Sequence, residues 1–367
     1  MPLTVRTSQK QVVPIGSYTP ESGQRIETVE VAVETVGTLT PEKDNAVLVC
    51  HALTGDSHAV GKEGDSGWWD GLIGPGGYID TNRYFVITMN VLGGCDGTTG
   101  PSSVNPATGQ PYGSQFPFIT IRDMVHVQRL CLDRLGVSSL HAVIGGSMGG
   151  MMVLEWGVLY PDRVGKLIPI ATAAALSPTA IAYNDVGRQA ILSDPDFCEG
   201  DYYPGPGPVK GLSIARMMGM ITYRTAELFE KRFSRNLQDY GGSQRSSESV
   251  FQIESYLRYQ GRKLVNRFDA NTYLRLLKAM DTHDIGRGRG GKEKALRLIQ
   301  SPVLVIGIRE DMLFPIQQQR ELHDGLFRMN KSSRLVEISS EYGHDAFLVD
   351  FKQTGREIES FLSKDLL

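Results

Sequence analysis

The chain has 367 residues, of which 41% are hydrophobic and 22% are charged, the proportions of an ordinary globular protein with room for a sizeable core. Its 38 basic and 41 acidic residues leave a formal charge of -3 at pH 7. A charge so close to balance gives no support for a protein that binds nucleic acid or an anionic membrane surface.

Short apolar runs along the chain predict its strands. Residues 26–37, IETVEVAVETVG, alternate apolar and polar side chains, as half-buried antiparallel strands at a sheet edge do. Later runs lack this alternation, which is typical of parallel strands covered on both faces. These runs are AVLVCHALTG (46–55), YFVITMNVLGG (84–94), HAVIGG (141–146), KLIPIAT (166–172), PVLVIGI (302–308) and RLVEIS (334–339).

Helical patterns separate several of these strands. Residues 118–136, FITIRDMVHVQRLCLDRLG, place most of their apolar side chains roughly on one helix face. Strands that alternate with helices predict an α/β fold with a mostly parallel, doubly wound sheet. Between about residues 176 and 298 this alternation stops, and helix formers, Arg and Met become frequent. We therefore predict a core domain of residues 1–175 and 299–367, with residues 176–298 inserted as a helical lid.

A serine surrounded by glycines follows the strand predicted at 141–146. In HAVIGGSMGGMMVLEW (141–156), Ser147 stands between Gly145 and Gly149 and fits G-x-S-x-G, the pattern of a sharp strand-to-helix turn that exposes a nucleophile. Side chains at the flanking positions would collide with the neighbouring strand and helix, so these positions favour glycine. The motif alone also arises by chance, and Ser147 acts as a nucleophile only if the rest of the chain supplies its partners.

The partners of such a serine are a base, usually histidine, and a carboxylate that orients the base. In α/β-hydrolases the three residues follow in the order Ser, Asp or Glu, His, each after a strand of the sheet. REDMLFP follows the strand at 302–308 and offers Glu310 or Asp311, although either also suits a solvated turn. SEYGHDAFL follows the last strand and offers His344. Of the other six histidines, we expect only His51 near the site.

Two backbone N–H groups are expected to form the oxyanion hole, one directly after the nucleophile and one in an early strand-to-helix loop. Met148 supplies the first. The loop HALTGDSH (51–58) follows the strand AVLVC directly, so we expect Leu53 to supply the second. The alternative is that HALTG is an ordinary turn containing glycine.

Four segments together resemble the homoserine O-acetyltransferase family of the α/β-hydrolase fold: GGSMGGMMVLEW (145–156), NVLGGCDGTTGPSSVNPATGQPYG (90–113), DMLFP (311–315) and EYGHDAFL (341–348). The resemblance implies a ping-pong acyl transfer in methionine biosynthesis. Ser147 takes the acetyl group from acetyl-CoA, and the hydroxyl of L-homoserine then attacks the acyl-enzyme with His344 as base. The family's DxLFP pattern matches Asp311 rather than Glu310. Cys95 and Asp96, in GGCDGTTG, depart from the family's common residues and leave the role of that loop open.

The resemblance also implies that Arg216 and Asp345 bind the amino acid. The chemistry agrees, because a zwitterion needs a guanidinium fork for its carboxylate and an anion for its ammonium group. The alternative for Arg216 is a surface cation on a helix. Tyr223, about two helical turns from Arg216, is expected either to line the acyl pocket or only to pack within the lid.

Other functions remain open from the sequence. An esterase or thioesterase would use the same triad, whereas a non-catalytic ligand receptor of this fold would lack part of it. Succinyl-CoA in place of acetyl-CoA, or serine in place of homoserine, depends on pocket volume. GRGRGG (286–291) matches G-x-G-x-x-G, but no apolar strand precedes it. We predict there a flexible basic loop whose Arg287, Arg289 and Lys292 meet CoA phosphates.

The remaining expectations concern cofactors, location and assembly. We expect no metal and no bound prosthetic group, with acetyl-CoA only as a co-substrate. The N-terminus MPLTVRTSQKQVV lacks an apolar signal region, no run of about twenty apolar residues is present, and the four cysteines are scattered without CxxC. These features predict a cytoplasmic protein outside the membrane. The family is usually dimeric through its lid, and the Met-rich helices fit either a homodimer contact or closure over substrate.

Overall fold

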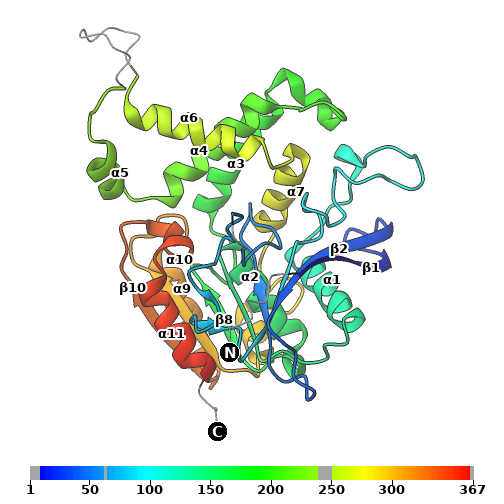
Figure 1. Ribbon diagram of the computed structural model, residues 1–367, viewed down its shortest axis with the longest axis vertical. Coiled ribbons are helices and arrows are strands. Elements are labelled where there is room, and N and C mark those ends of the chain that lie inside the picture. Colours follow the sequence, from blue (N-terminus) through cyan, green and yellow to red (C-terminus); the bar gives the residue numbers. More distant parts are fainter. Residues whose placement is uncertain (1–8, 62–63, 239–249, 364–367) are drawn as a thin grey trace.

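The computed structural model describes residues 9–61, 64–238 and 250–363, which form a sheet flanked by helices with a second group of helices above it (Figure 1). The strands are β1 (Gln9–Tyr18), β2 (Ile26–Val36), β3 (Ala46–Cys50), β6 (Phe85–Met89), β7 (Ala142–Gly146), β8 (Leu167–Ile170), β9 (Val303–Ile308) and β10 (Ser333–Ile338), with β4 (Ile73–Gly74) and β5 (Ile79–Asp80) paired separately. The order in the sheet is β1-β2-β6-β3-β7-β8-β9-β10. All pairs from β6 to β10 are parallel, which confirms the predicted α/β fold.

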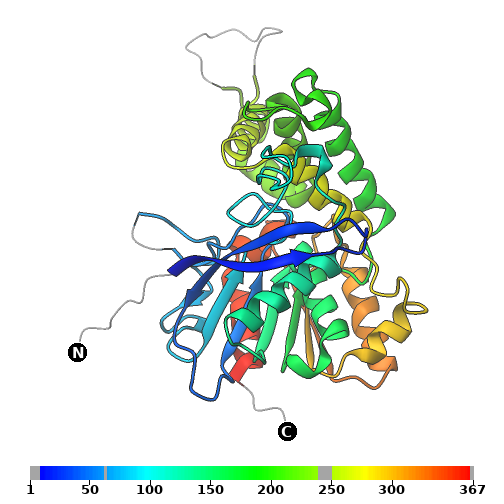
Figure 2. The same cartoon turned by 90° about the vertical axis from the view of Figure 1, so that its right-hand side faces the viewer.

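The antiparallel edge of the sheet is longer than the sequence pattern indicated. β2 pairs antiparallel with β6, as expected for residues 26–37, but β1 covers its other side and was not predicted. Pro14 and a register shift at Gly16 interrupt the β1 pattern. An edge strand tolerates a proline and an irregular register, because the N–H group that proline lacks is not needed to pair with another strand. Figure 2 shows this long ribbon crossing the molecule below the upper helices.

The parallel strands are apolar throughout because alternate side chains enter two different cores. In β3, Ala46, Leu48 and Cys50 belong to the core under one face, whereas Val47 and Val49 belong to the core under the other. β9 divides its residues in the same way. The first core also holds buried residues of α1 (Ile121–Arg134) and α2 (Met148–Leu159), and the second holds buried residues of α11 (Phe351–Ser363). Both faces of the sheet are therefore covered, as in a doubly wound fold.

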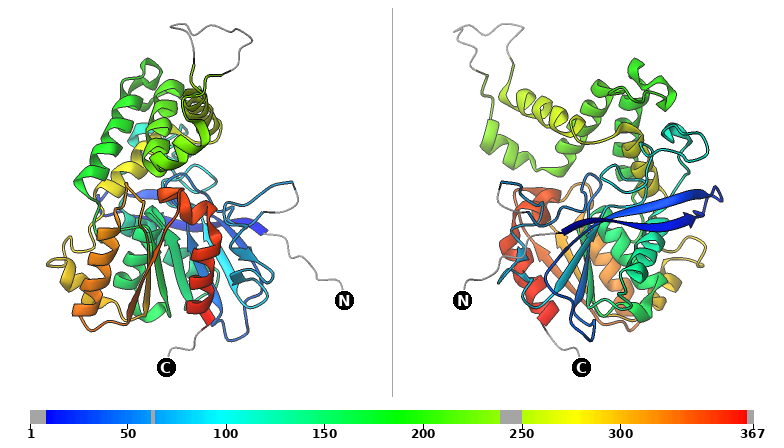
Figure 3. Two further views of the ribbon diagram at one scale, coloured as in Figure 1. Left: turned by 90° about the vertical axis from the view of Figure 1, so that its left-hand side faces the viewer. Right: turned by 45° about the vertical axis from the view of Figure 1, so that its right-hand side comes forward.

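The helices form two groups (Figures 1 and 3). Around the sheet lie α1 (Ile121–Arg134), α2 (Met148–Leu159), α8 (Lys292–Leu298), α9 (Ile316–Arg328), α10 (Ala346–Val349) and α11 (Phe351–Ser363). Above it lie α3 (Pro178–Leu192), α4 (Val209–Tyr223), α5 (Ala226–Phe233), α6 (Gln252–Val265) and α7 (Ala270–Asp281), which we call the lid helices. α8 falls within the lid limits predicted from the sequence but packs against α2 and α9. None of the described helices is both long and apolar enough to cross a membrane.

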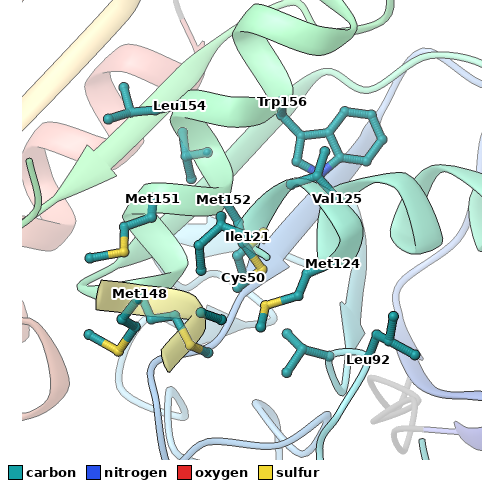
Figure 4. Packing of buried hydrophobic residues seen from close by; sticks show 14 of the residues in the cluster. Cys50, Leu92, Ile121, Met124, Val125, Met148, Met151, Met152, Leu154 and Trp156 are labelled. Carbon is teal, nitrogen blue, oxygen red and sulfur yellow. The ribbon is translucent and has the colours of Figure 1, made fainter. Parts of the chain in front are cut away.

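The packing of α1 against α2 supports the strand-to-helix turn at Ser147 (Figure 4). α1 begins with a capping box in which the Thr120 hydroxyl accepts the Asp123 N–H and the Asp123 carboxylate accepts the Thr120 N–H. Met124 and Val125 are buried on its inner face. Trp156 of α2 donates its indole N–H to Gln128 at 2.9 Å, which satisfies a polar group inside this core.

Candidate active site

Ser147 occupies a strained turn between β7 and α2. Its φ is 58° and its ψ is -123°, a backbone conformation that residues with a side chain rarely adopt. The Ser147 N–H donates to the Ile170 carbonyl at 2.9 Å, and the Thr172 hydroxyl donates to the Ser147 carbonyl at 3.0 Å. The end of β8 therefore holds both backbone groups of the strained residue.

The glycines on either side of Ser147 are required by the approach of β3. A Cβ at Gly145 would lie 2.7 Å from the carbonyl oxygen of Cys50, and one at Gly149 would lie 2.2 Å from the same atom. Such contacts are far shorter than van der Waals separation. The collision expected from the sequence motif is thus present at both positions.

His344 and Asp311 come together although they follow different strands. Asp311 lies just after β9, and His344 lies in a single helical turn, Gly343–Asp345, beyond β10. The Asp311 Oδ2 is 2.6 Å from the His344 Nδ1, and the Asp311 Oδ1 accepts the N–H groups of Leu313 and Phe314, both at 2.8 Å. Both side chains are buried. Glu310, the alternative acid, is exposed and instead accepts the Ser339 hydroxyl.

The surroundings of His344 determine its basicity. Burial lowers the pKa of the imidazole, but the charge of Asp311 and the hydrogen bond to it raise the pKa by more, with a smaller contribution from Asp345. The pKa therefore lies above the ordinary value for histidine. The ring of Phe314 stacks on the imidazole at 5.3 Å, and Phe347 meets it edge-on at 5.5 Å. These rings hold the imidazole plane in place.

Ser147 lines a small cavity together with Tyr223, which lies beside His344. A cavity of about 30 Å³ is lined by Ser147, Leu53 and Tyr223, among other residues, and the Tyr223 ring lies 5.8 Å from the imidazole of His344. Within the described residues, the Ser147 hydroxyl makes no hydrogen bond to His344. Such bonds are often long in free enzymes and shorten when substrate binds.

The two N–H groups expected for the oxyanion hole are both available. Met148 is the first residue of α2, where a helix leaves its N–H groups without intrahelical partners. Leu53 lies in the loop after β3 and lines the cavity with Ser147. In the part of the chain that the structure describes, neither N–H donates a backbone hydrogen bond. The positive end of α2 adds to the attraction for a negative oxygen at this position.

The predicted substrate residues, Arg216 and Asp345, both lie near Tyr223. The Arg216 guanidinium lies 5.7 Å from the centre of the Tyr223 ring. Burial raises the pKa of Tyr223, Arg216 lowers it and Asp345 raises it, so both charged groups act on this phenol. Arg224 pairs with Asp345, with its Nε 2.9 Å from the Asp345 Oδ2, a contact that no sequence pattern predicted. The only signal is its position at the end of α4, one residue after Tyr223.

The GRGRGG loop is fastened to the core. Arg289 forms a bidentate pair with Glu155 of α2, at 2.7 and 3.0 Å, and Arg122 approaches the same carboxylate at 3.2 Å. Arg287 pairs with Glu21 at the surface. Glu155 is only 1% exposed, so the charge of Arg289 is neutralised inside the protein. This pairing corrects the expectation that Arg289 belongs to a flexible loop and meets CoA phosphates.

No group of three or more His, Cys, Asp or Glu side chains within residues 9–61, 64–238 and 250–363 is arranged to hold a metal ion. The four cysteines are free thiols, and burial raises the pKa of Cys50 to about 12.

Comparisons with known proteins show the family of the chain. The alpha/beta hydrolase fold family matches residues 45–351. The chain is 52% identical to the homoserine O-acetyltransferase of Symbiobacterium thermophilum, over 99% of this chain and 96% of that one. The crystal structure of homoserine O-acetyltransferase from Bacillus anthracis superposes with a TM-score of 0.91 at 32% identity, covering 98% of each chain. Esterase E22 superposes with a TM-score of 0.90 at 31% identity, covering 97% of this chain and 100% of that one. The chain belongs to the alpha/beta hydrolase fold family and, within it, to the homoserine O-acetyltransferases.

Proposed function

We propose that the chain transfers an acetyl group from acetyl-CoA to the hydroxyl of L-homoserine, through an acetyl ester on Ser147, as a step in methionine biosynthesis. The observation that carries the proposal is the contact of 2.6 Å between Asp311 and His344 beside the strained Ser147. The Arg224-fixed carboxylate of Asp345 and the guanidinium of Arg216 lie around the same site. An active site that hydrolyses neutral esters needs no such pair of opposite charges. A site that binds a zwitterionic acceptor needs both charges.

In the first half-reaction, the Ser147 oxygen attacks the thioester carbonyl while the His344 imidazole takes its proton. The carbonyl oxygen becomes negative and accepts the N–H groups of Leu53 and Met148. His344 then gives the proton to the departing sulfur, so that CoA leaves as a thiol and the acetyl group remains on Ser147. Asp311 keeps the Nδ1–H of His344 in place and stabilises the imidazolium that forms between these steps.

In the second half-reaction, the homoserine hydroxyl attacks the acetyl ester, and His344 accepts its proton. The ester bond to Ser147 breaks, and the serine oxygen recovers the proton from His344. Arg216 binds the carboxylate of the acceptor, and Asp345 binds its ammonium group. Tyr223 lines the acyl cavity between them. The cycle uses protein groups alone, with no metal and no bound prosthetic group.

The cavity at Ser147 supports acetyl as the transferred group. Its volume is about 30 Å³, close to the space that one or two water molecules need. None of the described side chains that line it is charged. A succinyl group would place a carboxylate in this space without a cation among the residues that line it, which is costly. Homoserine and serine differ by one methylene, and we propose homoserine because the related enzymes bear its name.

An esterase is the second candidate, because esterase E22 has the same fold at a TM-score of 0.90. The two functions differ in what captures the acyl-enzyme. We therefore propose to follow CoA release from acetyl-CoA with a thiol reagent, with and without homoserine. We expect homoserine to accelerate continuous release by at least about 100-fold, since a bound, oriented acceptor competes strongly with water. Equal rates with and without homoserine would identify a hydrolase.

Two variants make this test specific. Ser147→Ala is expected to abolish release under all conditions. Asp345→Asn is expected to keep the first, single turnover of CoA release but to lose most of the acceleration by homoserine, because of the two substrates only the acceptor binds that carboxylate. Loss of both phases in Asp345→Asn, with the fold intact, would show that the carboxylate does not act on the acceptor. Acetyl-CoA and succinyl-CoA are each measured against homoserine and serine.

We also propose that the enzyme is a cytoplasmic homodimer. The four free thiols support a reducing compartment. The outer sides of α4 and α6 border a groove of about 780 Å³ that is lined by Val209, Ile214 and Tyr259, among other residues. Ile214 is 51% exposed and Tyr259 is 55% exposed, so a contact between two copies of the lid would remove apolar surface from water.

A further inference from the structure

His51 is a buried histidine that lies behind the loop carrying Leu53. It directly follows β3, and only 1% of its surface is exposed. Its Nδ1 lies 2.7 Å from the carbonyl oxygen of Ala52. Its Nε2 lies 3.2 Å from the backbone nitrogen of Val91 and 3.3 Å from the side-chain amide of Asn90. The two nitrogens of the ring thus join two loops of the site region.

The partners of the ring determine where its proton lies. A carbonyl oxygen only accepts hydrogen bonds, so the Nδ1 must carry the proton that reaches Ala52. A backbone nitrogen only donates, so the Nε2 facing Val91 must be unprotonated. Burial lowers the pKa of His51 and favours the same neutral form. One tautomer therefore satisfies both contacts.

Together with the Gly55 N–H, which donates to the same carbonyl at 2.9 Å, the contact of His51 with Ala52 fixes the direction of the Leu53 N–H. The carbonyl of residue 52 and the N–H of residue 53 belong to one planar peptide unit, and in a trans peptide they point in opposite directions. Among the described residues the only cis bond is Tyr203-Pro204, so this unit is trans. When His51 holds the carbonyl on one side, the N–H is held toward the other side. Leu53 lines the cavity there together with Ser147.

The loop around Cys95 and Asp96, whose role the sequence left open, supports this arrangement. The Asp96 N–H donates to the Asn90 Oδ1 at 3.2 Å, which turns the amide NH₂ of Asn90 toward His51. A Cβ at Gly94 would lie 2.4 Å from the Asn90 Oδ1. Thr98 and Thr99 tie the loop to β2 by accepting the N–H groups of Ala32 and Glu30, each at 2.9 Å.

We infer that His51, in its Nδ1–H form, is a positioning residue that aims the Leu53 N–H into the oxyanion hole, with the 90–99 loop as its support. The inference rests on the acyl-serine chemistry of the proposed function but not on the identity of the acceptor. It assigns a role in the transition state, where the oxyanion exists, rather than in substrate binding.

The test measures acetylation of Ser147 alone, with p-nitrophenyl acetate as acyl donor. We expect His51→Leu to lower the acylation kcat by about 100-fold, since one oxyanion donor is worth about that much. The KM should stay within about threefold, because the donor acts only in the transition state. His51→Asn should recover at least about tenfold of the loss, because its amide NH₂ can replace the Nδ1–H donor. The pH profile, which reports His344, should not move in either variant.

Two further variants keep the test decisive if His51→Leu does not fold. Gly55→Ala leaves the imidazole intact but places a Cβ 2.8 Å from the His51 Cβ, so it should displace the contact and lower kcat in the same way. His141→Leu is the matched control: it removes a histidine that bonds a carbonyl, of Leu362, at the opposite end of β7 from Ser147, and should keep kcat.

The outcomes separate this inference from the proposed function. If His51→Leu and Gly55→Ala keep kcat within about threefold of the parent enzyme, the inference is wrong. It is also wrong if folded His51→Asn shows no recovery over His51→Leu. If Ser147→Ala acetylates as fast as the parent enzyme, the proposed function itself fails. Loss of kcat with an unchanged KM and recovery by Asn supports the inference.

Discussion

Asp311 uses its two oxygens for different tasks. The Oδ1 accepts two backbone N–H groups from the turn that follows, so the carboxylate cannot rotate, and the Oδ2 meets the His344 Nδ1. A carboxylate fixed in this way holds the imidazole in one orientation and one tautomer. The Nε2 is then the nitrogen left to act on the proton of Ser147.

This arrangement predicts a change in pH dependence when the charge of Asp311 is removed. His344 is a base only when neutral, so the rate rises as the pH rises through its pKa, which lies above the ordinary value of 6.5. Asp311→Asn removes the charge that raises the pKa of His344. The acid limb of the pH-rate profile should therefore move to lower pH. The maximal kcat should fall by about 10,000-fold, because an amide favours the wrong tautomer.

The rate of thiol release, measured as a function of pH, tests this prediction. Glu310→Gln is the matched control for Asp311→Asn. Glu310 is exposed and, among the described residues, bonds only Ser339 and the Ser340 N–H, so its loss should change kcat by no more than about twofold. If the two variants behave alike, Asp311 is not the orienting acid. A movement of the acid limb to higher pH in Asp311→Asn would also contradict the assignment.

The sequence predicted where the residues of the proposed triad lie, because their positions follow from strand order. Ser147, Asp311 and His344 each follow a parallel strand, and the carboxyl ends of parallel strands meet at one sheet edge. The pair between Arg224 and Asp345 was not predicted, because these residues are 121 positions apart and meet only through the way the lid rests on the core. No periodicity in the chain encodes that docking.

At the scale of elements, helix α2 is held at its beginning and again in its second half. Its beginning carries Ser147, and further along it Glu155 lies buried between Arg122 and Arg289, the latter from the 286–291 loop. Three charges in a region of low polarity are stable only while each keeps its partners. The loop and the helix therefore stay together as one unit.

This burial makes Glu155 important for stability. We expect Glu155→Gln to lower the free energy of unfolding by about 3 kcal/mol, because it leaves two arginines beside a neutral side chain. The midpoint of urea unfolding, followed by circular dichroism, measures the change. Glu337 is the matched control, since it too lies between two arginines, Arg309 and Arg320, but at the surface. Glu337→Gln should cost far less, because solvent screens exposed charges. Equal losses would refute the role of burial.

Some elements could be predicted better than others, for physical reasons. The inner strands are apolar on both faces and were identified by that property alone. β1 was missed because Pro14 and the irregular register at Gly16 break its pattern, which only an edge strand tolerates. α8 was assigned to the lid because it continues a helical composition, whereas its buried Ala295 and Leu296 belong to the core beside α2.

At the scale of the whole molecule, the lid helices lie above the sheet (Figure 3), at the edge where Ser147 lies. They leave apolar residues such as Ile214 exposed. If two copies join there, light scattering of the purified protein should give twice the mass of one chain. Ile214→Glu should give the mass of a single chain, because it places a charge in the contact.

Phe327→Glu is the control for this substitution. Phe327 is 70% exposed on α9, outside the lid. The substitution therefore changes an apolar surface residue without affecting the proposed contact. It should remain dimeric. A parent protein with the mass of one chain, or dissociation by Phe327→Glu alone, would contradict an assembly through the lid.

The narrow, uncharged space beside Ser147 also has a consequence for ligand design. The group of an inhibitor that reacts with this serine must be short and neutral, since the residues that line the cavity leave little room and carry no charge. Selectivity over other serine enzymes would have to come from a head group bearing one amine and one acid, placed to reach Asp345 and Arg216. Potency and selectivity can thus be optimised on separate halves of the compound.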